Sequence, residues 1–199
     1  MTPETPYHHG DLPDALVRSA IELLEEGGAS ALSLRAVARH AGVSTAAPYR
    51  HFPDRTALLS AVAAVGYTEL AQDLVAVNPE PSSPEDLAAV AVAYVDFALR
   101  RPGMFRVMFT EGCDTSSPER VSAVAAVHDY LGSIVTRVLP DAPSEAMATA
   151  IWALVHGLAF LHLDGKLDST TDTEVAHQVS ESVRAALRYS IPPEQESPR

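Results

Sequence analysis

The stretch SLRAVARHAGVSTAAPYRHFPDR, residues 33 to 55, decides the fold of this chain. Ser33 is placed to cap a first short helix, and Gly42 can take the left-handed conformation that ends it. Ser44 can then cap a second helix that runs to Phe52. Arg35 and Arg39 fall outside the buried face of the first helix, which is formed by apolar residues at the spacing of one helical stripe: Leu34, Val37, Ala38 and Ala41.

The second of these two helices has the composition of a helix that reads DNA. Thr45, Ala46 and Ala47 make its start slim enough to enter a major groove. The polar run from Tyr49 to His51, which includes Arg50, can reach phosphates and base edges. A plain helical hairpin inside an all-helical core is the alternative, but a buried hairpin has no use for this polar run. The pattern therefore predicts a helix-turn-helix with residues 44 to 52 as the recognition element.

A wider segment, from Leu12 to Leu59, resembles the amino-terminal DNA-binding domain of TetR-family transcriptional regulators. The resemblance is carried by AGVS, by the tetrapeptide YRHF and by the DRTALL that follows. It implies three helices that form the DNA-binding unit, a long fourth helix that leads to a helical ligand-binding domain, and a homodimer that acts on a palindromic operator.

The resemblance also implies roles for single residues. Ser33 would touch phosphate, whereas Tyr49 and His51 would grip the DNA backbone. Arg55 stands where the family usually has lysine, and its guanidinium can still bind a phosphate. With the exposed arginines added, the predicted DNA-binding set is Ser33, Arg35, Ser44, Thr45, Ala46, Tyr49, Arg50, His51 and Arg55, in which Ser44, Thr45 and Ala46 would face bases.

Two residues depart from the family pattern. Thr45 stands where many members carry lysine, and this shifts recognition toward shape, hydroxyl bonds and thymine methyl groups. Pro48 lies one turn into the recognition helix, near the limit at which its missing amide is tolerated. We expect a distorted or shifted first turn there.

The charge of the chain is unusual for a DNA-binding protein, since the formal net charge is -12. Residues 1 to 60 hold five arginines and seven acidic residues, whereas residues 61 to 199 hold nine basic and nineteen acidic residues. The acidity therefore belongs mainly to the second part of the chain. With few cations near the DNA, binding should be modest in affinity and sensitive to salt.

The remaining sequence predicts an all-α protein of about nine helices, because helical periodicity recurs and no strand alternation is visible. We expect a DNA-binding domain over residues 1–53 and an effector-binding and dimerisation domain over residues 54–199. Asp54 can cap a long helix at the start of the second domain. Further helices are predicted near residues 11–26, 84–101, 119–139, 144–165 and 173–189, with a short apolar piece over residues 104–109.

Most large apolar side chains of the chain fall in the second half, where they would suit a cavity for a small, mostly apolar effector. A packed core is the alternative, and residue types do not separate the two. The segment W-x-x-x-H-G that starts at Trp152 is similar to one found in a subgroup of TetR-like regulators, and His156 in it is either a pocket contact or a hydrogen-bonded core residue. The predicted effector-binding residues are Tyr94, Phe97, Phe105, Met108, Phe109, His128, Trp152 and His156.

The last two helices are predicted to form a dimer interface. The helix over residues 146–163 is apolar nearly all round, which implies burial on both sides. Val175, Val179, Val183 and Leu187 form a stripe at four-residue steps on the last helix. One face of each helix can pack on its own subunit and the other on a twin.

Other classes of function have weaker support in the sequence. No catalytic signature surrounds the histidines, and no cofactor or metal site is expected: His8 and His9 lie in a tail, while His156 and His162 diverge around a helix. The lone Cys113 and the absence of a signal segment favour a cytoplasmic protein, and the apolar run 151–163 is too short to span a bilayer. The expected function is a ligand-responsive repressor. A metal- or redox-responsive regulator and a helical module that does not bind DNA stay open as alternatives.

Overall fold

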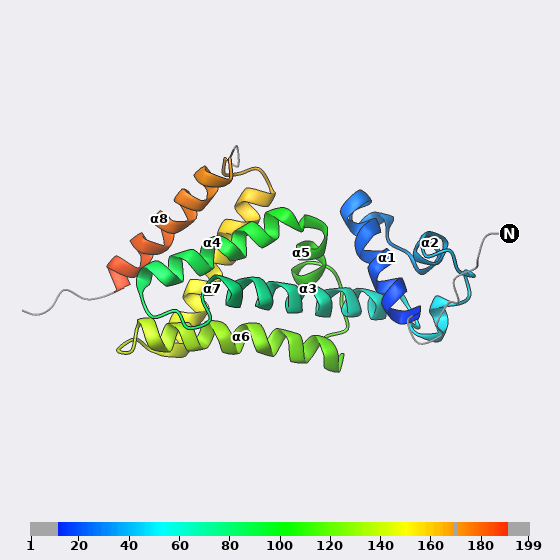
Figure 1. Cartoon of the computed structure of the whole chain (residues 1–199), viewed down its shortest axis with the longest axis horizontal. Coiled ribbons are helices and arrows are strands. Elements are labelled where there is room, and N and C mark those ends of the chain that lie inside the picture. Colours follow the sequence, from blue (N-terminus) through cyan, green and yellow to red (C-terminus); the bar gives the residue numbers. More distant parts are fainter. Residues whose placement is uncertain (1–11, 169–170, 191–199) are drawn as a thin grey trace, which may run out of the picture. The chain divides into compact units, whose positions relative to one another are not determined.

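The computed structural model describes residues 12–168 and 171–190, and every regular element in this part of the chain is helical. The predicted all-α class is confirmed (Figure 1). Eight α-helices and two short 3₁₀-helices follow one another in the order α1 (Leu12–Gly27), η1 (Ala29–Ala31), α2 (Leu34–His40), η2 (Pro48–Arg50), α3 (Arg55–Val77), α4 (Pro84–Arg100), α5 (Pro102–Phe109), α6 (Pro118–Val138), α7 (Ser144–Leu163) and α8 (Asp172–Ser190).

The chain packs as two compact units. The first unit comprises residues 1–68 and 101–124, and the second comprises residues 69–100 and 125–199. The chain therefore passes between them three times: inside α3, at the junction of α4 and α5, and inside α6. The predicted boundary at residue 53 separates a DNA-binding domain from an effector-binding domain. The packing units do not test that functional boundary, so it stays a prediction.

In the first unit, α1 packs against α2 and α5. The buried face of α1 includes Leu16 and Ala20, which are both fully buried. The backbone of α5 comes so close to α1 that a Cβ added at Gly103 would lie 2.6 Å from the carbonyl oxygen of Leu24. Glycine at position 103 thus permits the close approach of two helix backbones. The other end of α5 is bound to α3, because the hydroxyl of Tyr67 donates a hydrogen bond to the carbonyl of Met108 at 3.0 Å.

In the second unit, α4 packs against both α7 and α8. The predicted stripe of α8 is confirmed as a buried face, since Val179 and Val183 are almost completely buried. Arg100 at the end of α4 pairs with Asp73 of α3 and with Asp96, each at 2.7 Å. The packing of α4 on α8 covers the apolar stripe of α8 and leaves polar residues on the outer face of that helix.

Helix α7 is long, apolar and only partly covered in the single chain. It extends over 20 residues and is long and apolar enough to cross a membrane, although its most apolar 18-residue window is only 22% buried. The sequence predicts that the apolar run 151–163 is too short for a bilayer, but the helix around it, predicted near residues 144–165 and observed over Ser144–Leu163, has the length and composition of a span. Length and composition alone do not separate a membrane span from a soluble helix that packs on a partner.

Candidate DNA-binding surface and effector cavity

The first helix of the helix-turn-helix, α2, has the predicted caps at both ends. Ser33 caps its start, since its hydroxyl accepts a hydrogen bond from the amide of Ala36 at 3.1 Å. Gly42 has the predicted left-handed conformation, with φ of 70°. The amide of Val43 then donates to the carbonyl of Ala38 at 2.9 Å, which completes a Schellman motif. Both caps fix the direction in which the chain enters the recognition segment.

The recognition segment is shorter and tighter than predicted. A continuous α-helix over residues 44–52 is wrong: a turn leads into η2, and hydrogen bonds run from Ala47 to Ser44 and from Arg50 to Ala47. The cause is Pro48, which has no amide to donate to the carbonyl of Ser44 and so cannot continue an α-helical ladder. This segment also accounts for eight α-helices in the described residues where about nine were expected.

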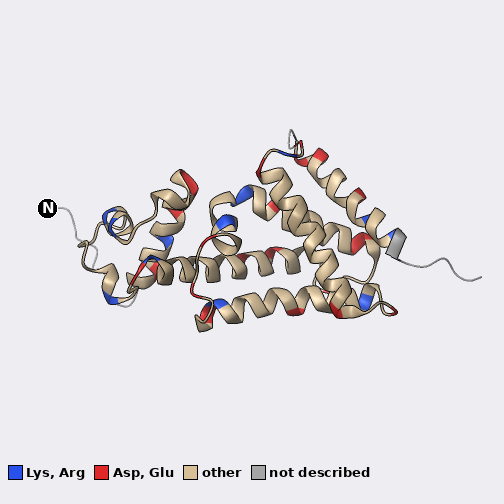
Figure 2. Ribbon diagram, turned by 180° about the vertical axis from the view of Figure 1, so that it is seen from behind, with Lys and Arg blue, Asp and Glu red and all other residues tan. Residues whose placement is uncertain are grey.

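Most of the predicted DNA-binding side chains are exposed. Pro48 and Phe52 are buried beneath the segment and fix it to the first unit, while the ring of Tyr49 is 50% exposed. Basic residues lie in α2 and in the segment that follows it (Figure 2). The exposed members of the set are Ser33, Arg35, Ser44, Thr45, Ala46, Tyr49, Arg50 and His51.

Arg55 differs from the other members because its guanidinium binds within the first unit. Its Nε donates to the carbonyl of Leu32 at 3.2 Å, and Nη2 donates to that of Ala29 at 2.9 Å. The same nitrogen lies 3.3 Å from a carboxylate oxygen of Glu111. Arg55 thus joins the start of α3 to the loop before α2 and to the segment after α5, and sequence reasoning missed this role.

The eight predicted effector-binding residues fall into both units. The first unit holds Phe105, Met108 and Phe109, and the rings of Phe105 and Phe109 are 4.7 Å apart. Phe105 is fully buried there, as is expected of a core residue. The second unit holds the other five, of which Phe97 is almost completely buried in α4, and the structure brings together Tyr94, His128, Trp152 and His156.

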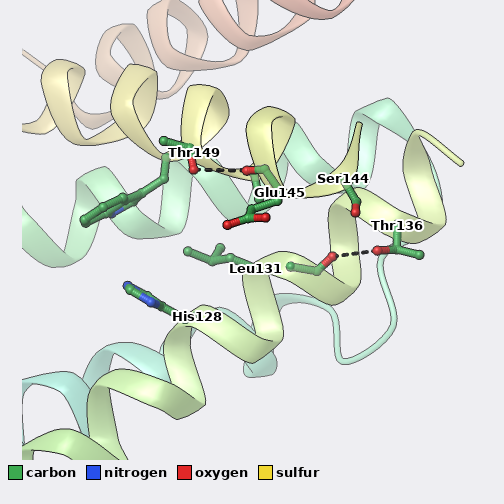
Figure 3. Close-up of a pocket in the computed structure, with 9 residues that line it drawn as sticks. His128, Leu131, Thr136, Ser144, Glu145 and Thr149 are labelled. Atoms are coloured by element: carbon green, nitrogen blue, oxygen red, sulfur yellow. Dashed lines mark hydrogen bonds between the residues drawn. The ribbon is translucent and has the colours of Figure 1, made fainter. Parts of the chain in front are cut away.

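A cavity of about 450 Å³ opens between α6 and α7 in the second unit. Its volume is in the range that proteins use for small organic ligands. Figure 3 shows the carboxylate of Glu145 directed into this space, with His128 on the opposite helix. The cavity is lined by His128, Leu131, Gly132, Thr136, Ser144, Glu145, Ala148, Thr149 and Trp152.

A second, smaller and apolar cavity of about 30 Å³ shares three of these residues: Leu131, Ala148 and Trp152. Its other walls come from α4, α6 and α7 and include Tyr94 and Val155. The two cavities therefore meet at Trp152, with the polar groups on the side of the larger one. Sequence reasoning found His128 and Trp152 but missed Glu145, Thr136 and Thr149, because single polar residues on α6 and α7 carry no signal of their own.

The W-x-x-x-H-G segment of α7 is joined to α4 by hydrogen bonds to Tyr94. The indole Nε1 of Trp152 donates to the Tyr94 hydroxyl at 3.4 Å, and this hydroxyl lies 3.0 Å from Nδ1 of His156. Burial lowers the pKa of His156, so the neutral ring can accept the hydroxyl proton at Nδ1. Within the described residues, His156 is outside the linings of both cavities and serves as a hydrogen-bonded support behind Trp152.

These features match known proteins in both halves of the chain. The model of the tetracyclin repressor-like C-terminal domain matches residues 87–188, and that of the bacterial regulatory proteins of the tetR family matches residues 16–62. The chain belongs to the TetR family of transcriptional regulators. The chain is 25% identical over 178 residues to the uncharacterized HTH-type transcriptional regulator YobS of Bacillus subtilis strain 168, covering 86% of this chain and 88% of that protein.

Solved structures agree with this assignment. A Rhodococcus sp. RHA1 protein of unknown function is 36% identical, with a TM-score of 0.77, over 92% of this chain and 98% of that chain. The FadR regulator of Bacillus subtilis, solved with stearoyl-CoA, has a TM-score of 0.66 over 85% of this chain and 96% of its own, but at 13% identity it supports the fold of this TetR-family chain alone.

Metal and redox sensing find little support in the described residues. No group of three or more His, Cys, Asp and Glu side chains lies close enough there to hold a metal ion. His8 and His9 lie outside the described residues. Burial raises the pKa of the Cys113 thiol, which leaves less of the reactive thiolate at neutral pH. No observation in the described residues of this TetR-family chain favours metal sensing or redox sensing.

Proposed function

We propose that this TetR-family regulator is a homodimeric, cytoplasmic repressor without catalytic activity, released from a palindromic operator by a small effector in the cavity between α6 and α7. The observation that carries the proposal is the cavity of about 450 Å³ in the second unit, together with the exposed helix-turn-helix in the first. A gel-shift assay with the promoter region of its own gene tests DNA binding. Absence of salt-sensitive, sequence-specific binding would favour a module that does not bind DNA.

The neighbouring FadR regulator, solved with stearoyl-CoA, suggests one effector chemistry to compare with this chain. An acyl-CoA carries several negative charges on its phosphates, which regulators hold with lysine or arginine. Within the described residues, the lining of the large cavity includes neither. We therefore propose a smaller effector whose apolar part rests on Leu131 and Trp152.

Effector binding can act on the first unit through the chain itself. The cavity wall on α6 begins at His128, only a few residues after the point where this helix leaves the first unit. Helix α3 crosses between units in the same way and carries Asp54, its predicted cap, whose carboxylate accepts from the amide of Ala57 at 2.8 Å. We propose that the effector shifts these continuous helices, with α3 as a lever that changes the separation of the two recognition segments. Release of DNA with an unchanged separation would contradict the lever.

The roles proposed for Tyr49 and Thr45 predict different effects on DNA binding. Tyr49→Phe removes a hydroxyl that would bind phosphate, so affinity for every sequence should fall by about five- to tenfold. Thr45→Ala removes a group that would face one base pair, so discrimination at that pair should fall by roughly 1 kcal/mol. Gel shifts with the operator and with single-base variants measure both. Equal effects of the two substitutions on all sequences would contradict the assignment.

The proposed dimer explains the uncovered face of α7. Four exposed residues of α7 are small or apolar and recur on one face of the helix: Ala146, Ala150, Ala153 and Leu161. An isologous contact with the same face of a second copy would cover them and, with α8, form a four-helix interface. A helix that packs on a twin also accounts for an apolar composition that would suit a membrane.

We expect Leu161→Ala to weaken the dimer by about five- to tenfold, since an apolar anchor at the interface would be lost. Sedimentation equilibrium over a range of concentrations gives the dissociation constant. Val77→Ala is the matched control, because Val77 at the end of α3 is 47% exposed and Leu161 is 43% exposed. A monomeric wild-type protein, or equal effects of both substitutions, would contradict this interface.

A further inference from the structure

We infer that the cavity between α6 and α7 recognises an amphipathic organic cation, with a protonated amine beside Glu145 and an apolar body against Leu131 and Trp152. This inference rests on the proposed function, which makes the cavity the effector site, and it adds the charge and the hydrogen-bonding character of the effector.

The charge of the lining is the first argument. Within the described part of the chain, the lining contains one acidic residue, Glu145, and no lysine or arginine. Glu145 lies in the first turn of α7, and its carboxylate is directed into the cavity (Figure 3). An ammonium group placed there gains a charge-assisted hydrogen bond, whereas a carboxylate would be repelled.

The cation that follows the lining residues on α6 does not offset this charge, because its guanidinium binds elsewhere. Nε of Arg137 donates to the carbonyl of Pro81 at 3.0 Å, and Nη2 donates to the hydroxyl of Ser133 at 3.1 Å. In the sequence of the second unit, acidic residues outnumber basic ones by sixteen to six. The surrounding field therefore favours entry of cations and disfavours anions.

The two threonine hydroxyl groups of the lining give a second, independent argument. Thr136 donates its proton to the carbonyl of Gly132 at 3.1 Å, and Thr149 donates to that of Glu145 at 3.0 Å. Each hydroxyl has a single proton, so both oxygens can only accept a further hydrogen bond. Together with the carboxylate, the two threonine oxygens offer acceptors to a ligand that carries several N–H donors, while Ser144 and His128 in the same lining can also donate.

The inner side of the cavity suits an apolar body with an aromatic ring. The rings of His128 and Trp152 meet edge to face with centroids 5.5 Å apart. Trp152 also borders the small apolar cavity, together with Leu131 and Ala148. Such a wall binds aliphatic and aromatic groups by contact area, while the face of the indole is also favourable for a nearby cation.

The test uses three probes of similar size: phenylbutylamine, phenylbutanol and phenylbutyrate. Trp152 is the only tryptophan in the sequence, so its fluorescence reports on this cavity directly. At neutral pH we expect the amine to bind about fivefold more tightly than the alcohol and the acid to bind least, a difference moderated by the exposure of Glu145. Glu145→Gln should bring the amine to the affinity of the alcohol. The matched control Glu85→Gln, at the exposed start of α4 and outside both linings, should leave the order unchanged.

Each result has a distinct meaning. Equal binding of amine and alcohol to the wild type, or a preference that survives Glu145→Gln, overturns the cation inference while leaving the cavity as an effector site. Failure of all three probes to change Trp152 fluorescence overturns both. A parallel gel shift separates the two claims further: an amine that binds through Glu145 and leaves operator binding unchanged supports the cation site but contradicts its role in DNA release.

Discussion

Replacement of Phe105 by alanine is expected to lower the free energy of unfolding of this regulator by about 3 to 5 kcal/mol. Phe105 is fully buried in α5, and its ring lies 4.7 Å from that of Phe109. The substitution would leave a cavity beside Phe109 in the core of the first unit, and the neighbouring backbone can close it only in part. Thermal and denaturant unfolding followed by circular dichroism measure the loss.

Val121→Ala is the control for Phe105→Ala. Val121 lies on α6 within the first unit and is 49% exposed, so its truncation should change stability by less than about 0.5 kcal/mol. The experiment also decides between two roles for Phe105, which the sequence assigns to the effector site. If Phe105→Ala kept its stability but lost the fluorescence response to the preferred probe, Phe105 would be an effector contact and not a core residue.

Gly103→Ala is expected to destabilise the first unit by about 1 to 2 kcal/mol, although alanine is ordinarily the better helix former. The added Cβ would lie 2.6 Å from the carbonyl oxygen of Leu24, and a backbone atom cannot move aside as a flexible side chain can. Helix α5 must then separate from α1. Because α1 supports α2, we also expect weaker operator binding, measured by gel shift at a temperature where the variant is still folded.

Replacement of Gly132 by alanine should have the opposite effect on stability. Gly132 lies inside α6, and a Cβ added there would meet nothing within 4 Å. Gly132→Ala should therefore raise the stability by about 0.5 to 1 kcal/mol through helix propensity alone. If both variants lost or both gained stability, the close approach of α5 to α1 would not be the cause.

The local signals of the sequence predicted the helices well because each depends on a few neighbouring residues. Ser33 and Asp54 cap helices as expected, and Gly42 ends α2 in the left-handed conformation. The stripe of α8 is buried, since the periodicity of its valines leaves no other face for the core. Features of this kind are decided within one or two turns of helix.

The rest depended on competition between local preferences or on contacts distant in sequence. The missing amide of Pro48 predicts a distorted turn, but it does not predict that the whole recognition segment becomes a tighter turn in which the Ser44 carbonyl accepts from Ala47. The aromatic residues near position 105 and those on α7 look alike in the sequence, yet they pack in different units. Glu145 gains its significance from the facing helix α6, across a cavity that the residue types alone do not reveal.

The bonds of Arg55 bear on the design of hybrid regulators that combine the DNA-binding half of one protein with the sensing half of another. A graft that ends at residue 53 would separate this guanidinium from the carbonyls of Ala29 and Leu32, and a recipient with lysine there could not reproduce the fork. Its third partner, Glu111, belongs to a segment near the middle of the sequence. The DNA-binding module that can be transferred from this regulator is consequently discontinuous in sequence. A hybrid protein must include residues 101–124 together with the amino-terminal helices.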